Sequence, residues 1–389
     1  MKIFWMGEAC DFPPESETGT IVTRWTATPL SNIDIYCEQP YTTPDGSRIA
    51  VLRSNSSDPR MPPSELCVVD MKRYRIGLVE PTVRSILVAT AGYTGILHYL
   101  DGELNLVRFD MSTLEREVLF QWTLAEDFCF HSATPDGRYL VSTVQEPDYS
   151  TSLVRVDLQT GKAETIYNHP EIITHVQVNP SNGRDILVQY NRGAGVNDEG
   201  EARPVENPLT GATHFIIDID GGNIRPLAIG EPYTSSSTGH SAWVADTGRI
   251  GLSVAYSWKN PNQPGDLDER YPNGNFFIVG PDDKAPINFH TPNHRFNHVG
   301  VSRDGKYFVC DCYAKGVPYN IALVLGNVQT GKHRTLVADC GATGGCAGNS
   351  HPHPYITADN KCVIYNSDRT GVCQVHAAHI SEEFLQSLD

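Results

Sequence analysis

Two histidines, His351 and His353, lie one residue apart, and each is followed by a proline. Proline fixes its own φ and favours an extended conformation in the residue before it. Side chains two positions apart in an extended segment share one face. We therefore expect both imidazoles to point the same way, toward one ion or one substrate.

Other histidines stand at a fixed spacing before a turn signal. His240, His298 and His353 each lie six residues before an aspartate, and His131 and His175 lie five and seven residues before the corresponding Asp or Asn. Three neutral imidazoles with an open coordination position suit a divalent transition metal. The alternative, a structural hydrogen bond between neighbouring units, stays open for each histidine taken singly. His131 and His175 fit that structural role better, although either could bind substrate.

The turn signals belong to a repeat that must position these histidines. An Asp-Gly turn at residues 43–46 recurs at 134–137 and 303–305, and each copy precedes a run of β-branched and aromatic residues. Weaker copies bring the total to about seven units of roughly 40 to 60 residues, the period of a β-propeller blade. The sequence therefore predicts an all-β fold, a seven-bladed β-propeller of four-stranded antiparallel blades, with residues 1–389 as a single domain.

In a propeller the first strand of each blade lines the axial channel, so equivalent positions in several blades meet in one small region. The histidines would meet there. The ring must also close, because an open sheet edge would be exposed, and we expect a strand within about residues 18–28 to join the last blade. Residues 191–212 and 258–274 are expected to be long loops, and residues 381–386 a short helix capped by Ser381.

The composition limits the partners and the location. A net charge of −16 argues against nucleic acid, whose phosphates need a basic surface. No apolar run approaches the roughly 20 residues of a membrane helix, and the first residues do not resemble a signal peptide. Most of the 10 cysteines are therefore expected to be reduced thiols. We expect a cytoplasmic protein with a small-molecule partner and with neither a nucleic acid nor a membrane, while the oligomeric state is open.

Other motifs carry no separate chemistry. Residues 326–332 match the phosphate-loop pattern GxxxxGK, but His333 stands where Ser or Thr is required, and a similar turn recurs at residues 159–162. The sequence contains neither a GxSxG nor an HExxH motif. The aspartates of the Asp-Gly turns are expected to form turns rather than a site.

Together these residues resemble the oligogalacturonate lyases, the propellers of polysaccharide lyase family 22. The resemblance rests on residues 18–24, 39–46, 239–241, 298–305 and 351–372, and it extends loosely over nearly the whole chain. It implies a metal-dependent lyase that cleaves short acidic, uronic acid-containing oligosaccharides by β-elimination, as in pectin degradation. It also implies Mn²⁺ as the divalent ion.

The same resemblance implies roles for single residues. It assigns the ion to His298, His351 and His353, with an amide-bearing ligand just upstream of the pair, and it assigns catalysis to His240. The chain departs from the family at the amide: the family has Gln three residues before the pair, and this chain has Gly there. Asn349 is the nearest amide and is the candidate fourth ligand.

Further residues are candidates for contact with the substrate. A family arginine close to the position of Thr213 has no counterpart, and Arg192 or Arg203 could take its place. Tyr256 and Lys259 follow the catalytic histidine in the same predicted blade. Either of them could bind substrate or protonate the leaving group.

The implied reaction is consistent with these residue types. A β-elimination removes the weakly acidic proton α to a uronate carboxylate and expels the C4 oxygen. A divalent ion on the carboxylate stabilises the negative charge that develops. The imidazole of His240, with an ordinary pKa of about 6.5, can take the proton near neutral pH. Two alternatives stay open: a metal-dependent hydrolase or epimerase on an acidic sugar, and a non-catalytic propeller that binds a protein or peptide.

Overall fold

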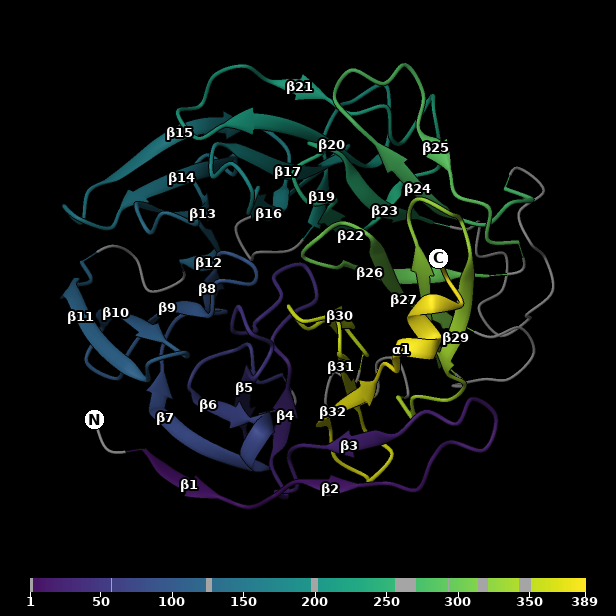
Figure 1. The fold of residues 1–389 in the computed structure, drawn as a ribbon. Helices are drawn as coiled ribbons and strands as arrows, with labels where there is room; N and C mark the ends of the chain where they lie inside the picture. The colour runs from purple at the N-terminus through teal and green to yellow at the C-terminus, as the bar shows by residue number, and fades with distance from the viewer. Residues whose placement is uncertain are drawn as a thin grey trace.

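The structure, a computed structural model, describes residues 3–56, 58–123, 128–196, 202–255, 271–292, 294–313, 321–342 and 351–389. Its strands form antiparallel sheets that follow one another in chain order around a ring (Figure 1). In each four-stranded unit the first strand lies toward the centre of the ring and the last toward the rim.

The first sheet runs outward from the centre and ends on the N-terminal strand. It consists of β4 (Ser31–Ile33), β5 (Arg48–Ser54), β6 (Ser64–Asp70), β7 (Arg75–Val83) and β1 (Phe4–Met6), with the short 3₁₀ helix η1 (Met71–Arg73) before β7. The next sheet has eight strands, in two successive meanders. They are β8 (Ala89–Thr90), β9 (Ile96–Leu100), β10 (Asn105–Asp110) and β11 (Glu115–Gln121), followed by β12 (Cys129–Ala133), β13 (Tyr139–Gln145), β14 (Thr151–Asp157) and β15 (Ala163–His169). Parallel pairing of β8 with β12 joins the two meanders.

Four-stranded sheets continue the ring. They are β16 (Ile173–Val178), β17 (Asp185–Arg192), β20 (Gly211–Asp218) and β21 (Arg225–Pro226); then β22 (Ser237–Trp243), β23 (Ile250–Val254), β24 (Phe276–Val279) and β25 (Ile287–Asn288); then β26 (Phe296–Val301), β27 (Tyr307–Tyr313), β28 (Ile321–Asn327) and β29 (His333–Val337). A separate hairpin of β18 (Ala194–Val196) and β19 (Ala202–Pro204) follows β17.

The two ends of the chain share one sheet. It contains β30 (Tyr355–Ile356), β31 (Cys362–Ser367), β32 (Gln374–His379), β3 (Val22–Arg24) and β2 (Cys10–Asp11). The antiparallel pairing of β3 with β32 places Val22 opposite Ala378. This pairing holds the start of the chain to its last sheet, and β2 then covers the outer edge of β3.

Apolar side chains fill the space between neighbouring sheets. Leu187 and Ile216 of one sheet pack with Trp243, Leu252 and Phe277 of the next, and all five are buried. Successive residues of a strand face opposite sides, so each sheet can contribute apolar side chains to both neighbours. The predicted all-β, propeller-like architecture is confirmed. The number of seven blades stays a prediction, since two successive units share one eight-stranded sheet.

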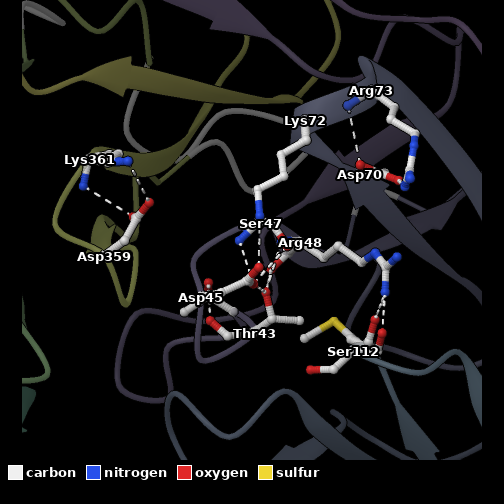
Figure 2. A network of polar contacts seen from close by, with 12 residues as sticks. Thr43, Asp45, Ser47, Arg48, Asp70, Lys72, Arg73, Ser112, Asp359 and Lys361 are labelled. Atoms are coloured by element: carbon white, nitrogen blue, oxygen red, sulfur yellow. Dashed lines mark hydrogen bonds and ion pairs between the residues drawn. The ribbon is translucent and has the colours of Figure 1, made fainter.

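The recurrent aspartates form turns, as the sequence predicted. Asp45 accepts hydrogen bonds from Thr43 Oγ1 at 2.8 Å, Ser47 N at 3.1 Å and Lys72 Nζ at 2.9 Å (Figure 2). Gly46 follows with a φ of +68°, a conformation that glycine adopts without steric cost. The same hydroxyl-to-aspartate bond recurs at Thr134 and Asp136, Ser302 and Asp304, and Thr357 and Asp359.

Four central strands contain a β-bulge where their histidine lies. The register shifts between Phe130 and Ser132 in β12, Thr174 and Gln177 in β16, Ser237 and Ser241 in β22, and Phe296 and Val299 in β26. A bulge adds a residue to one strand and changes the direction of its side chain. These bulges therefore set the directions of His131, His175, His240 and His298, which the repeat spacing alone does not reveal.

Several local predictions can be compared with the structure. Helix α1 (Glu382–Gln386) begins after Ser381, whose Oγ accepts a hydrogen bond from Phe384 N, as predicted. The loop expected at residues 191–212 is wrong in part, because β18 and β19 pair within it. Most of the second expected loop, residues 258–274, lies outside the described residues, which resume at residue 271. No helix in the described ranges is long and apolar enough to cross a membrane.

Buried neutral histidines are expected to make the fold sensitive to acid. His98 of β9 is 2% exposed, and burial lowers its pKa to about 4. Its unfolded pKa is about 6.5, so below that pH the unfolded chain binds the extra proton and stability falls as the pH falls. On lowering the pH from about 8 to 5, this histidine should reduce the free energy of unfolding by about 2 kcal/mol. Urea unfolding of wild type and His98→Leu at both pH values measures the effect. The difference in free energy of unfolding between the two proteins should change by that amount from one pH to the other. A difference that does not depend on pH would contradict the neutral state given to His98.

Candidate functional site

Five histidines from neighbouring elements meet near the centre of the ring: His175 of β16, His240 of β22, His298 of β26, and His351 and His353 just before β30. The ring centroids of His240 and His298 are 4.0 Å apart. His298 lies 4.5 Å from His353 and 5.4 Å from His351, and His175 lies 5.8 Å from His240. The structure therefore brings together five of the six histidines that the sequence singled out, all but His131, while their roles stay predictions.

A buried carboxylate holds His298. Its Nδ1 lies 2.6 Å from Asp311 Oδ2, and its backbone N donates to Asp311 Oδ1 at 2.6 Å. Burial raises the pKa of Asp311, which is on β27, to about 7. With Nδ1 engaged by Asp311, Nε2 is the nitrogen of His298 that can coordinate an ion. A carboxylate behind a ligating imidazole is a common arrangement in metal sites.

The segment that carries His351 and His353 is anchored to β31. Asn366 N donates to Pro352 O at 2.9 Å, and Asn366 Nδ2 donates to His351 O at 3.2 Å. The two imidazole rings are nearly parallel, with centroids 5.7 Å apart and both near His298. The extended conformation expected here is wrong at His353, whose φ is +44°, because the chain bends before it enters β30. Such a conformation costs about 1–3 kcal/mol and is found at functional sites.

We call His298, His351 and His353, the predicted ligands of a divalent transition metal, the histidine trio. The Nδ1 atoms of His351 and His353 are buried without a hydrogen-bond partner among the described residues. Burial lowers the pKa of His298 and His353 well below the ordinary value and also lowers that of His351, so the rings are neutral near pH 7. An unpaired buried nitrogen is costly, and a neutral imidazole is a ligand that transition metals prefer.

A second group of donors lies beside the trio. One atom from each of Glu38, His175 and His240 lies within 4.8 Å of the other two. These donors already have partners: His175 Nδ1 lies 2.6 Å from Glu38 Oε1, and His240 Nδ1 lies 3.3 Å from Tyr36 Oη. Burial lowers the pKa of His175, but the charge of Glu38 outweighs it and the net pKa is raised. A raised pKa favours the protonated imidazole, which has no lone pair for a metal. Among the described residues this is nevertheless the one group of three such donors that lie this close together, and the trio as the metal site stays a prediction.

His240 has a neutral imidazole next to the trio. Burial, and then the neighbouring imidazole of His298, lower the pKa of His240 well below the ordinary value. The ring is therefore uncharged near pH 7 and can accept a proton. Gly239 precedes it with a φ of +98°, and a Cβ there would lie 3.3 Å from His175 Nε2. The glycine allows the bulge to bring the two imidazoles together.

Two predicted substrate-binding residues have structural partners. His131 Nε2 lies 2.9 Å from Thr143 Oγ1, and burial, followed by the charge of His175, lowers the pKa of His131 to about 3. Arg192 is 7% exposed and donates to the backbone carbonyls of residues 210, 211 and 231. These contacts give Arg192 a role in bracing the loop, and its predicted contact with substrate finds no support in them.

The remaining predicted residues add little to the site. Tyr256, Lys259 and Asn349 lie outside the described residues, so their roles stay predictions. Thr213 Oγ1 donates a hydrogen bond to the backbone carbonyl of Ile229, in the segment that follows β21. The guanidinium of Arg203 lies 5.4 Å from the ring of Tyr149, in the turn between β13 and β14.

Sequence reasoning missed Tyr36, Arg60 and Asp311. The ring centroid of Tyr36 lies 4.7 Å from that of His353, and the guanidinium carbon of Arg60 lies over the Tyr36 ring, 5.7 Å from its centroid. Asp311 carried a usable signal, since it is a lone acid in an apolar strand, and a buried acid needs a partner. Tyr36 and Arg60 carried none, because they fall in connections outside the repeat.

Asp311→Asn is expected to weaken Mn²⁺ binding by about 10- to 100-fold, because the partner that orients a ligating histidine and raises its basicity is lost. Isothermal titration of the metal-free protein with Mn²⁺ measures the change. Asp218→Asn is the matched control, since Asp218 is also buried but pairs with Arg184 and Arg225. Equal affinities of the two variants would contradict the role given to Asp311.

Comparison with known proteins adds relatives at low identity. The chain is 25% identical over 328 residues to the oligogalacturonide lyase of Pectobacterium atrosepticum, an overlap of 74% of this chain and 75% of that protein. It is 23% identical over 332 residues to the oligogalacturonate lyase of Dickeya dadantii, an overlap of 75% and 76%. No protein-family model matches the chain.

One solved structure agrees with this fold over the full length of both chains. It is an oligogalacturonate lyase in complex with manganese, and it superposes with a TM-score of 0.69 at 20% identity. The match covers 98% of this chain and 100% of that chain. At this identity, the superposition establishes a shared fold.

Proposed function

The chain is a divergent relative of the oligogalacturonate lyases, and from this premise we propose that it is a metal-dependent lyase of short uronic acid-containing oligosaccharides. The reaction is β-elimination, and the substrate class is oligogalacturonate-like. The observation that carries the proposal is the histidine trio, with buried unpaired nitrogens, next to the neutral imidazole of His240. Mn²⁺ is the proposed ion, since the similar solved structure is a manganese complex.

The histidine trio is the proposed metal site. His298 would bind through Nε2, since Asp311 engages its Nδ1. The buried nitrogens of His351 and His353 would supply two further ligands. Asn349, upstream of the pair, stays the proposed fourth ligand. When bound, the ion supplies positive charge to a uronate carboxylate and so makes the proton α to it more acidic.

The neighbouring residues divide the proton transfers between them. His240 is neutral and takes the α proton, while Tyr36 Oη, 3.3 Å from its Nδ1, fixes the orientation of the ring. Glu38 raises the pKa of His175 and so favours its protonated form, and the ring centroid of His175 lies 5.8 Å from that of His240. His175 is therefore placed to donate a proton to the departing C4 oxygen. A base and an acid with opposite pKa shifts in one site are what an elimination requires.

The test is to supply the Mn²⁺-loaded protein with oligogalacturonate and to follow the ultraviolet absorbance of the unsaturated uronate product. We expect the signal to depend on the ion and to disappear with a chelator. Product mass separates the alternatives, because hydrolysis adds water and elimination does not. If galacturonate, glucuronate and mixed acidic oligosaccharides all give no unsaturated product, the proposal is overturned in favour of a hydrolase, an epimerase or a binding module. A cytoplasmic location stays a prediction.

A further inference from the structure

Arg60 is a cation next to the site that the proposed reaction does not yet use. It lies in the connection between β5 and β6, and its guanidinium carbon is 5.7 Å from the centroid of the Tyr36 ring. That ring in turn lies 4.7 Å from His353. The side chain of Arg60 is 23% exposed, so part of it is accessible to a ligand.

The guanidinium of Arg60 is held in one orientation. Its Nε donates to Asp58 Oδ1 and its Nη2 to Asp58 Oδ2, both at 2.9 Å. The backbone carbonyl of Arg60 also accepts from Leu87 N, which ties the connection to the next unit. Asp58 engages one edge of the planar group, and no acceptor is seen for Nη1 within the described ranges. The Nη1–Nη2 edge can therefore receive a second carboxylate in the bidentate geometry that arginine prefers.

We propose that Arg60 binds the carboxylate of a second uronate, in the sugar unit next to the one that reacts. The guanidinium carbon of Arg60 lies 5.7 Å from the centroid of the Tyr36 ring, which is itself 4.7 Å from the ring of His353, so Arg60 lies beside the trio. A uronate carboxylate held by the trio leaves the guanidinium for the carboxylate of the adjacent sugar. The net charge of −16 adds a reason, since an acidic chain needs a local cation to retain an acidic oligosaccharide. This inference rests on the proposed function and deepens it.

Binding calorimetry tests the inference without turnover when it is done in a His240→Asn background loaded with Mn²⁺. Galacturonate presents one carboxylate and digalacturonate presents two. We expect digalacturonate to bind the Arg60 protein more tightly than galacturonate does. Arg60→Leu should weaken the binding of digalacturonate about 10- to 100-fold, the usual contribution of hydrogen bonds to a charged group. It should leave the affinity for galacturonate nearly unchanged.

Two further variants separate the paired hydrogen bonds of the guanidinium from the effect of positive charge alone. Arg60→Lys keeps the charge but loses the fork, and we expect it to recover only part of the lost affinity. Arg73→Leu is the matched control, because Arg73 is in the same sheet region, 62% exposed and paired with Asp70, and it should bind both sugars as the parent does. Melting temperatures confirm that each variant is folded.

The outcomes separate this inference from the proposed function. If Arg60→Leu loses affinity equally for galacturonate and digalacturonate, the inference about Arg60 is overturned, since Arg60 would then bind the reacting sugar. Unchanged affinity for both sugars overturns the inference as well. If wild type cleaves oligogalacturonate and either result is found, the lyase proposal stands without Arg60. If wild type cleaves no uronate and the parent binds neither sugar, both proposals fall.

Discussion

His298→Ala is expected to remove the bound Mn²⁺ and to lower the rate of β-elimination by about 10³-fold. The loss corresponds to about 4 kcal/mol of charge stabilisation, which is of the size that a bound ion supplies. His298 is 2% exposed and has Asp311 behind it, so no water or neighbouring side chain can replace its nitrogen without rearrangement. Metal content after loading and dialysis, together with the initial rate of unsaturated-product formation, measures both effects.

Two comparisons give this experiment its meaning. His290→Ala removes an exposed histidine that contacts Asn273, and this variant should keep both metal and activity. His175→Ala should keep the metal, because Glu38 raises the pKa of His175 and so favours its protonated form, which has no lone pair for an ion. If His298→Ala retained Mn²⁺ and His175→Ala lost it, the group of Glu38, His175 and His240 would be the metal site instead. A melting temperature close to wild type shows that the lost metal is not the result of unfolding.

The convergence of the histidines could be predicted because spacing carries the information. The aspartate turns are fixed by local hydrogen bonds such as that of Thr43 with Asp45, and they mark the same point in each unit. Counting back from a turn therefore finds the same place on the central strand. His240, His298 and His353 share one count, and their rings lie together in the structure.

The directions of these side chains could not be predicted from the same count. The central strands β22 and β26 gain residues at a bulge, and His353 adopts a φ of +44° ahead of a proline. Neither feature has a signal in the repeat, because a bulge depends on how the neighbouring strand pairs. The expected extended geometry at His353 was wrong for this reason, although the two imidazoles still face the same neighbour.

Charged residues outside the repeat were the hardest to place. Arg192 was a candidate for substrate binding because it opens a polar insertion, yet its donors are used on backbone carbonyls. Arg60 lies in a short connection rich in Ser and Pro and gave no signal. Which arginine reaches the centre depends on the path of each connection. That path is set by tertiary contacts such as the one between Leu87 N and Arg60 O.

His240→Asn is expected to lower kcat by about 10²- to 10⁴-fold while Mn²⁺ and substrate still bind. This is the range that a positioned general base contributes. An amide keeps a polar side chain at the bulge but cannot take a proton at neutral pH. The ring of His240 is 4.0 Å from His298, so metal content must be measured beside the rate. Single-turnover rates with saturating oligogalacturonate report the chemical step, and calorimetry with Mn²⁺ reports the ion.

Tyr36→Phe supplies the graded comparison, since it removes the hydroxyl 3.3 Å from His240 Nδ1 but leaves the imidazole. The kcat of this variant should fall about tenfold, which is the contribution of one hydrogen bond that orients the base. Added imidazole should partly restore His240→Gly, a smaller variant that leaves space for it, and should not restore His298→Ala. If His240→Asn lost the ion together with its activity, His240 would be a metal ligand and the base would have to be sought elsewhere in the cluster.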